Sequence, residues 1–254
     1  MSNSDTPTPS LTTLPLEAYT TDRSAALTEP LDWYGPGKLH PTHLHDTLSA
    51  SSSRYRIAHK LDHGPHALSW LARDTHAATW RRVDVVHAAP EVTAAYARAA
   101  DAQLARRAEM GGDDDDDGAV ADARGLAIDR FWLRGPNGTH LCIVWPLNGE
   151  MGGFRWAVRD RSVMDEAWFV RQCAKIRGSA EAKVGSVHEI TEEEMLAILG
   201  RPRVIVVDEE MMREVGVSKE MVREGQVPRY LVVRPDKVEE DLEYWLSGEA
   251  FIKA

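Results

Sequence analysis

Residues 60–74, KLDHGPHALSWLARD, contain a short turn with one glycine between two segments that suit β-strands. A glycine-rich turn of this kind can lie over the phosphates of a nucleotide, because bare backbone comes close to a phosphate group. Here Gly64 is the one glycine in the turn, and Pro65 beside it has no N–H to donate. The turn is therefore a candidate for phosphate binding, and an ordinary hairpin turn is the competing interpretation.

A second segment with chemical potential is HPTHLHD, which contains His40, His43, His45 and Asp46. Imidazole and carboxylate groups both bind zinc, so these four residues could form a metal site. A polar loop facing the solvent has the same composition. We favour the loop and predict no metal site.

Composition limits the classes of function. The chain of 254 residues has a net charge of −10, which disfavours nucleic acid as a partner because phosphates would be repelled. The two cysteines, Cys142 and Cys173, form no CxxC pair, so neither a disulfide framework nor a cysteine zinc site is expected. No apolar run reaches the roughly 20 residues that a membrane span needs, and residues 1–22 lack the pattern of a signal peptide. We expect a protein of the cytoplasm or nucleus.

The elements that would position these residues follow from periodicity and from turn residues. Strands are predicted over residues 54–61, 66–74 and 80–88, and on both sides of the turn GPNG within residues 125–147. An alanine-rich segment that begins with Pro90 predicts a helix over residues 90–110. The fold class is therefore α+β, with a five-stranded antiparallel sheet and one helix.

The flanking regions differ from this part. Residues 1–30 are rich in Ser, Thr and Pro and are predicted to be mostly disordered. A helix is predicted over residues 162–176, and a second one starts at Thr191, where Glu194 completes a capping box. Short strands are predicted within residues 203–210 and 227–235.

Three strands, a helix and two further strands follow one another as in the small lobe of a protein kinase. The segments RYRIAHKLDHGPHALSWLARD, GPNGTHLCIV and VPRYLV resemble, in this order, the serine/arginine-rich-protein kinases, especially their divergent fungal relatives. The resemblance extends over residues 33–254. It implies a kinase-like small lobe over residues 31–148 and an incomplete, mostly helical remnant of the large lobe over residues 149–254.

The resemblance also implies which residues occupy the positions of the family's ATP pocket. These positions are Leu61, Gly64, Arg82, Asp84, Trp145, Pro146 and Asn148. Asp84 stands at the position of the family's phosphate-binding lysine, which turns an attraction of roughly 4 kcal/mol into a repulsion. Arg82 stands where a small alanine covers the adenine, so its side chain would fill that space. A shift of register in the turn over residues 75–79 would instead let Arg82 replace the lysine.

Other pocket positions are altered to different degrees. Asp62 replaces the first glycine of the phosphate loop, and Ser69 replaces an apolar residue that would pack on adenine. Trp145 is the gatekeeper-like residue, and the backbone of Pro146 and Asn148 would face adenine. Backbone contacts tolerate substitution, so this last segment is the part of the pocket best suited to hold a purine.

The catalytic residues of the family have no counterparts in this sequence. No HxD motif lies between the predicted helix at residues 162–176 and Thr191, and the position of the metal-binding aspartate falls on Ala254. We therefore predict no catalytic residues, no metal ligands and no cofactor, with ATP and Mg²⁺ bound only if nucleotide binding persists. The predicted role is protein binding by an inactive pseudokinase or kinase fragment, with a related kinase or its protein substrates as partners.

The alternative is an active or atypical serine/threonine protein kinase of the same family. It would use Arg82 in place of the lysine and take metal ligands from the acidic runs at residues 113–117 and 192–194. Adjacent like charges repel one another and stay solvated, so both runs are also typical of exposed loops and helix starts.

Overall fold

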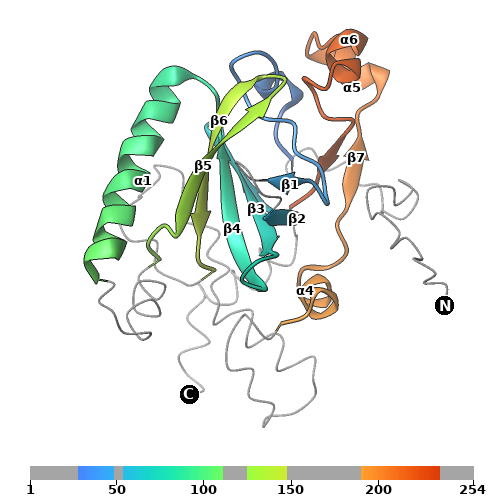
Figure 1. Ribbon diagram of the computed structural model, residues 1–254. Helices are drawn as coiled ribbons and strands as arrows, with labels where there is room; N and C mark the ends of the chain where they lie inside the picture. Colours follow the sequence, from blue (N-terminus) through green and yellow to red (C-terminus); the bar gives the residue numbers. More distant parts are fainter. Residues whose placement is uncertain (1–27, 49–53, 111–124, 148–189, 235–254) are drawn as a thin grey trace, which may run out of the picture.

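A computed structural model describes residues 28–48, 54–110, 125–147 and 190–234 (Figure 1). Its centre is an antiparallel sheet of six strands in the order β1-β2-β3-β4-β6-β5. The predicted number of five strands was therefore one too few. The additional strand, β1 (Thr47–Leu48), pairs with the start of β2 and has two residues, which is too short for an alternating pattern to be visible in the sequence.

The other elements of the sheet confirm the predicted ones to within about two residues at most ends. The bounds are β2 (Tyr55–His63), β3 (Ala67–Asp74), β4 (Thr79–Val86), α1 (Pro90–Met110), β5 (Asp129–Gly135) and β6 (Gly138–Trp145). Proline at the first helical position has a backbone angle that suits the start of a helix, which explains why α1 begins where the sequence predicts. The turn between β5 and β6 is held by the closing pair Gly135 and Gly138.

Helix α1 covers one face of the sheet, as Figure 1 shows. Its buried residues Tyr96 and Ala100 pack with Val86 of β4 and with Leu141 and Ile143 of β6. In a strand, alternate side chains point to the same face. This face therefore also carries the even-numbered residues of β4 and the odd-numbered residues of β3, and the candidate site described below lies on it.

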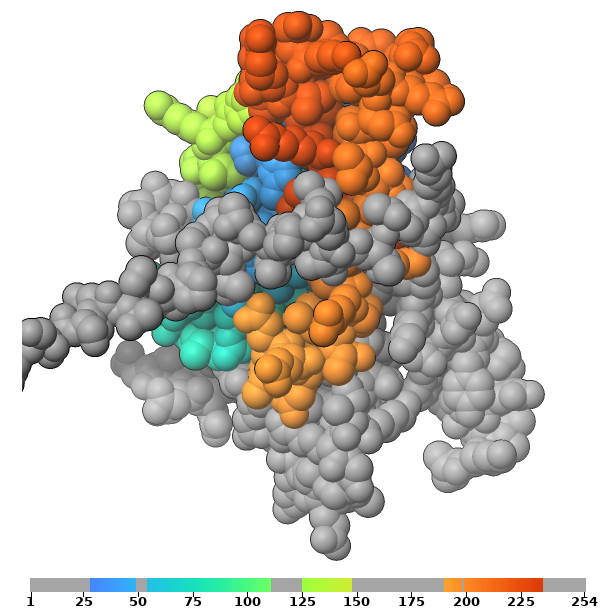
Figure 2. Space-filling model, turned by 90° about the vertical axis from the view of Figure 1, so that its right-hand side faces the viewer, coloured from blue at the N-terminus to red at the C-terminus, as the bar shows by residue number. Residues whose placement is uncertain are grey.

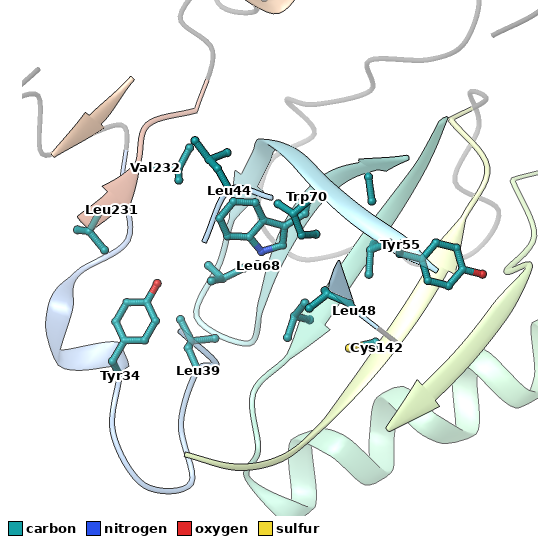
Figure 3. Close-up of a cluster of buried hydrophobic side chains, with 14 of the residues drawn as sticks. Tyr34, Leu39, Leu44, Leu48, Tyr55, Leu68, Trp70, Cys142, Leu231 and Val232 are labelled. Atoms are coloured by element: carbon teal, nitrogen blue, oxygen red, sulfur yellow. The ribbon is translucent and has the colours of Figure 1, made fainter. Parts of the chain in front are cut away.

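The opposite face of the sheet holds the largest hydrophobic cluster. Trp70 of β3 is central to it and packs with Leu39 and Leu44 from the segment that precedes β1. Leu231 and Val232, far away in the sequence, complete the cluster, and Figure 3 shows Leu44 and Val232 close to the indole ring of Trp70. One segment that precedes the six strands in the sequence and one that follows them therefore cover the same face of the sheet.

Residues 190–234 contain three short helices and a two-stranded sheet. Their bounds are α4 (Glu192–Leu199), β7 (Val204–Val206), α5 (Glu209–Glu214), α6 (Lys219–Arg223) and β8 (Tyr230–Val232). The predicted capping box of Thr191 and Glu194 is present at the start of α4. Figure 2 shows these orange and red residues gathered over one side of the molecule.

Helix α4 attaches to the sheet through a third hydrophobic cluster, in which Met195 and Leu199 pack with Leu71 and Trp80. The indole Nε1 of Trp80 also donates a hydrogen bond to the carbonyl of Ile190 at 2.8 Å. Residues 190–234 therefore share the hydrophobic core of the six-stranded sheet. Residues 148–189 lie outside the described residues. They include the predicted helix at residues 162–176 and the predicted lobe boundary at residues 148 and 149.

Of residues 1–30, which were predicted to be mostly disordered, the structure describes residues 28–30. Glu29 is only 2% exposed and pairs with buried Lys60 of β2. The composition of this segment has no periodicity from which a single buried contact could be recognised. None of the helices in the described part of the chain combines the length and the apolar character that a membrane crossing requires.

Candidate functional site

Four polar side chains from three neighbouring strands meet on the face that α1 covers. Ser69 of β3 lies opposite Asp84 of β4, and Arg82 of β4 lies opposite Trp145 of β6. Arg82 and Asp84 are two residues apart on one strand, so their side chains point to the same face. We call Ser69, Arg82, Asp84 and Trp145 the Asp84 cluster.

The carboxylate of Asp84 accepts hydrogen bonds from all three other members of the Asp84 cluster. Its Oδ1 accepts from Ser69 Oγ at 2.6 Å and from Arg82 Nε at 2.8 Å. Its Oδ2 accepts from Arg82 Nη2 and from Trp145 Nε1, both at 2.9 Å. Arg82 Nη2 also donates to Ser69 Oγ at 3.2 Å. A carboxylate has about four acceptor positions, so these contacts satisfy Asp84.

Charge is balanced inside the Asp84 cluster. Burial alone would lower the pKa of Arg82, but the charge of Asp84 and the hydrogen bonds to it raise this pKa above its ordinary value. Tyr96 of α1 is close enough to respond, since burial and then the charge of Asp84 raise the pKa of its hydroxyl. The two charges therefore form a lasting ion pair beneath α1 and neutralise one another.

This arrangement has clear chemical consequences. A carboxylate that accepts four charge-assisted or polar hydrogen bonds has no acceptor position left for a metal ion. A guanidinium bound to that carboxylate compensates little of the charge on a second anion. The Asp84 cluster is thus suited to holding β3, β4 and β6 together.

The structure brings three of the seven predicted pocket residues together: Arg82, Asp84 and Trp145. Leu61 lies in the adjoining hydrophobic cluster with Leu71, the strand partner of Arg82. Gly64 closes the turn between β2 and β3, where its N–H donates to the carbonyl of Ala67 at 2.9 Å.

The remaining pocket positions lie at the end of β6. Pro146 is buried directly after this strand, and Asn148 lies outside the described residues. Pairing between β3 and β4 is regular from Ala67 and Val86 to Asp74 and Thr79. Arg82 and Asp84 therefore both face α1, and the side chain of Arg82 is directed to Asp84.

The HPTHLHD segment does not bring its four candidate ligands to one point. His43 Nδ1 lies 3.7 Å from an oxygen of Asp46, whereas the ring of His40 packs against His140 of β6 with the ring centroids 4.9 Å apart. Within the ranges that the structure describes, no group of three or more His, Cys, Asp or Glu side chains could hold a metal ion.

The structure describes one of the two acidic runs. In the run at residues 192–194, Glu192 forms an ion pair with Arg56 of β2, and Glu194 belongs to the capping box of α4. Two of its three carboxylates therefore have structural partners. The run at residues 113–117 lies outside the described residues.

A second buried polar group was missed in the sequence. Lys60 of β2 is fully buried and bonds to Glu29, which also accepts a hydrogen bond from the hydroxyl of Tyr34. A strict alternation would place Lys60 on the face of Arg56. An irregularity between Ile57 and His59 shifts the pairing, so Lys60 comes opposite Trp70. A bulge has no reliable sequence signature here, and the alternation of the segment gave no sign of it.

Comparison with known proteins gives little further information. No protein-family model matches the chain, and no curated protein matches it. Among solved structures, the chain is similar to a crystal structure of a kinase domain, with 15% sequence identity and a TM-score of 0.29. The similar region covers 42% of this chain and 28% of that one, so it spans less than a third of the kinase domain's chain.

Proposed function

We propose that this chain is a protein-kinase-like protein that neither binds ATP nor transfers phosphate, and that it acts by binding another protein. The observation that carries the proposal is the saturated carboxylate of Asp84 at the sheet position where the kinase family has its phosphate-binding lysine. The partner would be a related kinase or one of its protein substrates. No metal ion or other cofactor is required.

The arrangement of elements supports the kinase-like assignment. Along the chain, the three antiparallel strands β2, β3 and β4 are followed by helix α1 and then by the hairpin β5–β6. In the sheet, these strands lie in the order β2-β3-β4-β6-β5. The helix lies on the face that carries Asp84. These are the relationships that the resemblance to the small lobe of kinases implies.

The chemistry of the Asp84 cluster supports the loss of nucleotide binding. Phosphoryl transfer depends on positive charge placed at the phosphates. Here a carboxylate occupies that position, and its nearest cation, Arg82, is bonded to it through two nitrogens. By the family resemblance, the Arg82 side chain would also fill the space in which a small alanine covers the adenine.

A thermal-shift experiment on the purified full chain tests this proposal. A ligand that binds only the folded state raises its stability, by about 2.7 kcal/mol at a concentration of 100 times Kd. We expect no change in melting temperature with millimolar ATP and Mg²⁺, while an active kinase measured in parallel shows a rise. A rise that depends on Mg²⁺ would contradict the proposal.

A phosphotransfer assay separates the proposal from its alternative, an active or atypical serine/threonine kinase. We expect no transfer of the labelled γ-phosphate to the chain itself or to a serine-rich substrate. Transfer above background that disappears in Arg82→Ala would support the alternative. The double variant Arg82→Ala/Asp84→Lys has the residue types of the kinase family at these two positions. If ATP stabilises this variant, the Asp84 cluster is the cause of the lost nucleotide binding.

A further inference from the structure

Strand β5 is the outermost strand on one side of the six-stranded sheet. Its inner edge pairs with β6 from Asp129 to Gly135. The outer row of its backbone N–H and C=O groups has no strand partner in the part of the chain that the structure describes. Such an edge is a template on which another extended segment can form a strand.

Three side chains of β5 give this edge a chemical character. Arg130, Trp132 and Arg134 are each two residues apart and so point to the face on which α1 lies. Trp132 is 45% exposed and has the largest side chain among the exposed hydrophobic residues of the described regions. A large aromatic surface between two cations offers an incoming strand one apolar contact and two positive charges.

The two arginines differ in their present contacts. Arg130 bonds to Asp101 of α1 at 2.6 Å, but Asp101 is 52% exposed and is a weak partner in water. Arg134 is exposed, and among the described residues no carboxylate lies within ion-pair distance of it. An incoming carboxylate would therefore find one arginine without competition and a second one held only by an exposed ion pair.

A second copy of this chain does not suit the edge in the register centred on Trp132. If two β5 strands paired antiparallel about Trp132, Arg130 of each copy would lie opposite Arg134 of the other. Like charges directly opposite one another across two strands are destabilising. The same geometry favours a strand with carboxylates at both positions and an apolar residue between them.

We infer that the outer edge of β5 binds an extended acidic peptide of a partner protein, which adds to the sheet as a further strand. Acidic residues of the peptide would lie opposite Arg130 and Arg134, and an apolar residue would lie on Trp132. The inference deepens the proposed function, on which it rests, by naming the surface and the class of partner. Main-chain hydrogen bonds would supply affinity, and alternate side chains would supply specificity.

The net charge of −10 opposes an acidic ligand at long range. At physiological salt the screening length is about 8 Å, so the charges nearest the edge dominate. Among the described residues, Asp101 next to β5 and Asp129 within it are already bonded: Asp101 to Arg130, and Asp129 to Tyr55 and Arg54. Of the described charges, Arg134 and, in part, Arg130 are therefore the ones that an acidic peptide on the outer edge would meet.

The experiment measures binding of a fluorescent peptide with the central sequence Glu-Thr-Val-Thr-Glu to the full chain by fluorescence polarisation. This sequence places its two carboxylates and its valine on one face of a strand. Two control peptides keep the length and change one property each. In the first, lysine replaces both glutamates; in the second, proline replaces the valine and cannot donate a main-chain hydrogen bond. We expect binding of the first peptide that weakens with salt, and at least about tenfold weaker binding of both controls.

Variants of the protein locate the site. We expect Trp132→Thr and Arg134→Glu to weaken binding of the acidic peptide at least about tenfold, or 1.4 kcal/mol. Val206→Thr is the matched control, because Val206 is 43% exposed on the separate strand β7, and its affinity should equal that of the unaltered chain. All three positions are exposed, so each variant should fold.

Three results would overturn the inference. The first is no binding of the acidic peptide at millimolar concentration, and the second is equal binding of the lysine peptide. The third is a dimer of the chain in size-exclusion chromatography with light scattering that Trp132→Thr converts to a monomer, since the occupant would then be a second copy. None of these results depends on ATP, so failure here and failure of the proposed function can be told apart.

Discussion

The ammonium group of Lys60 and the carboxylate of Glu29 form an ion pair within the core, on the face of the sheet that carries Trp70. Both side chains are buried, and Lys60 Nζ also lies 5.2 Å from the centroid of the Trp70 ring. Burial would raise the pKa of Glu29, but the charge of Lys60 and hydrogen bonds from Lys60 and Tyr34 hold it below its ordinary value. The pair connects the segment before β1 to the centre of the sheet.

The first prediction concerns this pair. Glu29→Gln should lower the free energy of unfolding by about 3–5 kcal/mol, because a buried ammonium group then has no countercharge. Urea unfolding followed by circular dichroism measures the change. Glu29→Leu/Lys60→Met removes both charges and should recover most of the loss. If the double variant is as unstable as Glu29→Gln, the loss of stability comes from losing the attraction within the ion pair and not from burying an unpaired ammonium group.

The second prediction concerns the Asp84 cluster. Trp145→Phe and Ser69→Ala each remove one donor to a charged carboxylate, and each should cost about 1.5–3 kcal/mol of stability. Because both donors act on Asp84, their effects should not add in the double variant. Thermal or urea unfolding of the two single variants and the double variant measures this coupling. Additive losses would mean that the two side chains stabilise the sheet independently of Asp84.

The third prediction is a dependence of stability on pH. Burial, together with nearby His140, lowers the pKa of His40 from 6.5 to about 4. The unfolded chain therefore binds more protons than the folded chain between these values. The free energy of unfolding should fall as the pH falls from about 6.5 to about 4, by up to about 1.4 kcal/mol per pH unit for each such histidine. His59 is buried with a similar pKa of about 4 and should contribute in the same direction.

Urea midpoints measured at several pH values between neutral and weakly acidic conditions test this dependence. His40→Gln should retain the contribution of His59 and lose its own, so its stability should change less steeply with pH. His76→Gln, at an exposed position in the turn after β3, should behave as the unaltered chain does. Equal slopes in all three proteins would exclude His40 as a source of the pH dependence.

The sequence predicted the elements whose signals are local. The turn GPNG, the alternating strands and Pro90 specify the hairpin β5–β6 and helix α1 because each depends on neighbouring residues. The residues of the Asp84 cluster were singled out through the family resemblance, but the four hydrogen bonds to Asp84 depend on the register of three strands. Pairing between residues so far apart in sequence leaves no local signal.

Glu29 and Lys60 were missed for the same kind of reason. Glu29 lies in a segment of low complexity, and Lys60 reaches the core only because the irregularity in β2 reverses the alternation beyond Ile57. Strand β1 has two residues, and its extended conformation depends on pairing with β2. Tertiary contacts therefore determine the parts that sequence periodicity could not supply.

The last prediction concerns Asn137 at the tip of the β5–β6 hairpin, which is 2% exposed. Its side-chain Nδ2 donates to the carbonyl of Leu39 at 2.7 Å and to the carbonyl of Gln226 at 2.6 Å. The main-chain carbonyl of Asn137 accepts a hydrogen bond from the N–H of Gly37 at 2.7 Å. One residue thus links the hairpin to the segment before β1 and to the segment before β8.

Asn137→Ala should leave the carbonyls of Leu39 and Gln226 without a donor, at a cost of about 1–3 kcal/mol each. Hydrogen exchange is the measurement of choice, because the loss should appear as faster exchange in the two segments that Asn137 connects and not in α1. Thr139→Ala, at an exposed position two residues along the same hairpin, should change stability by no more than about 0.5 kcal/mol. Unchanged exchange near Leu39 and Gln226 in Asn137→Ala would mean that the hydrophobic cluster around Trp70 holds these segments without help from the hairpin.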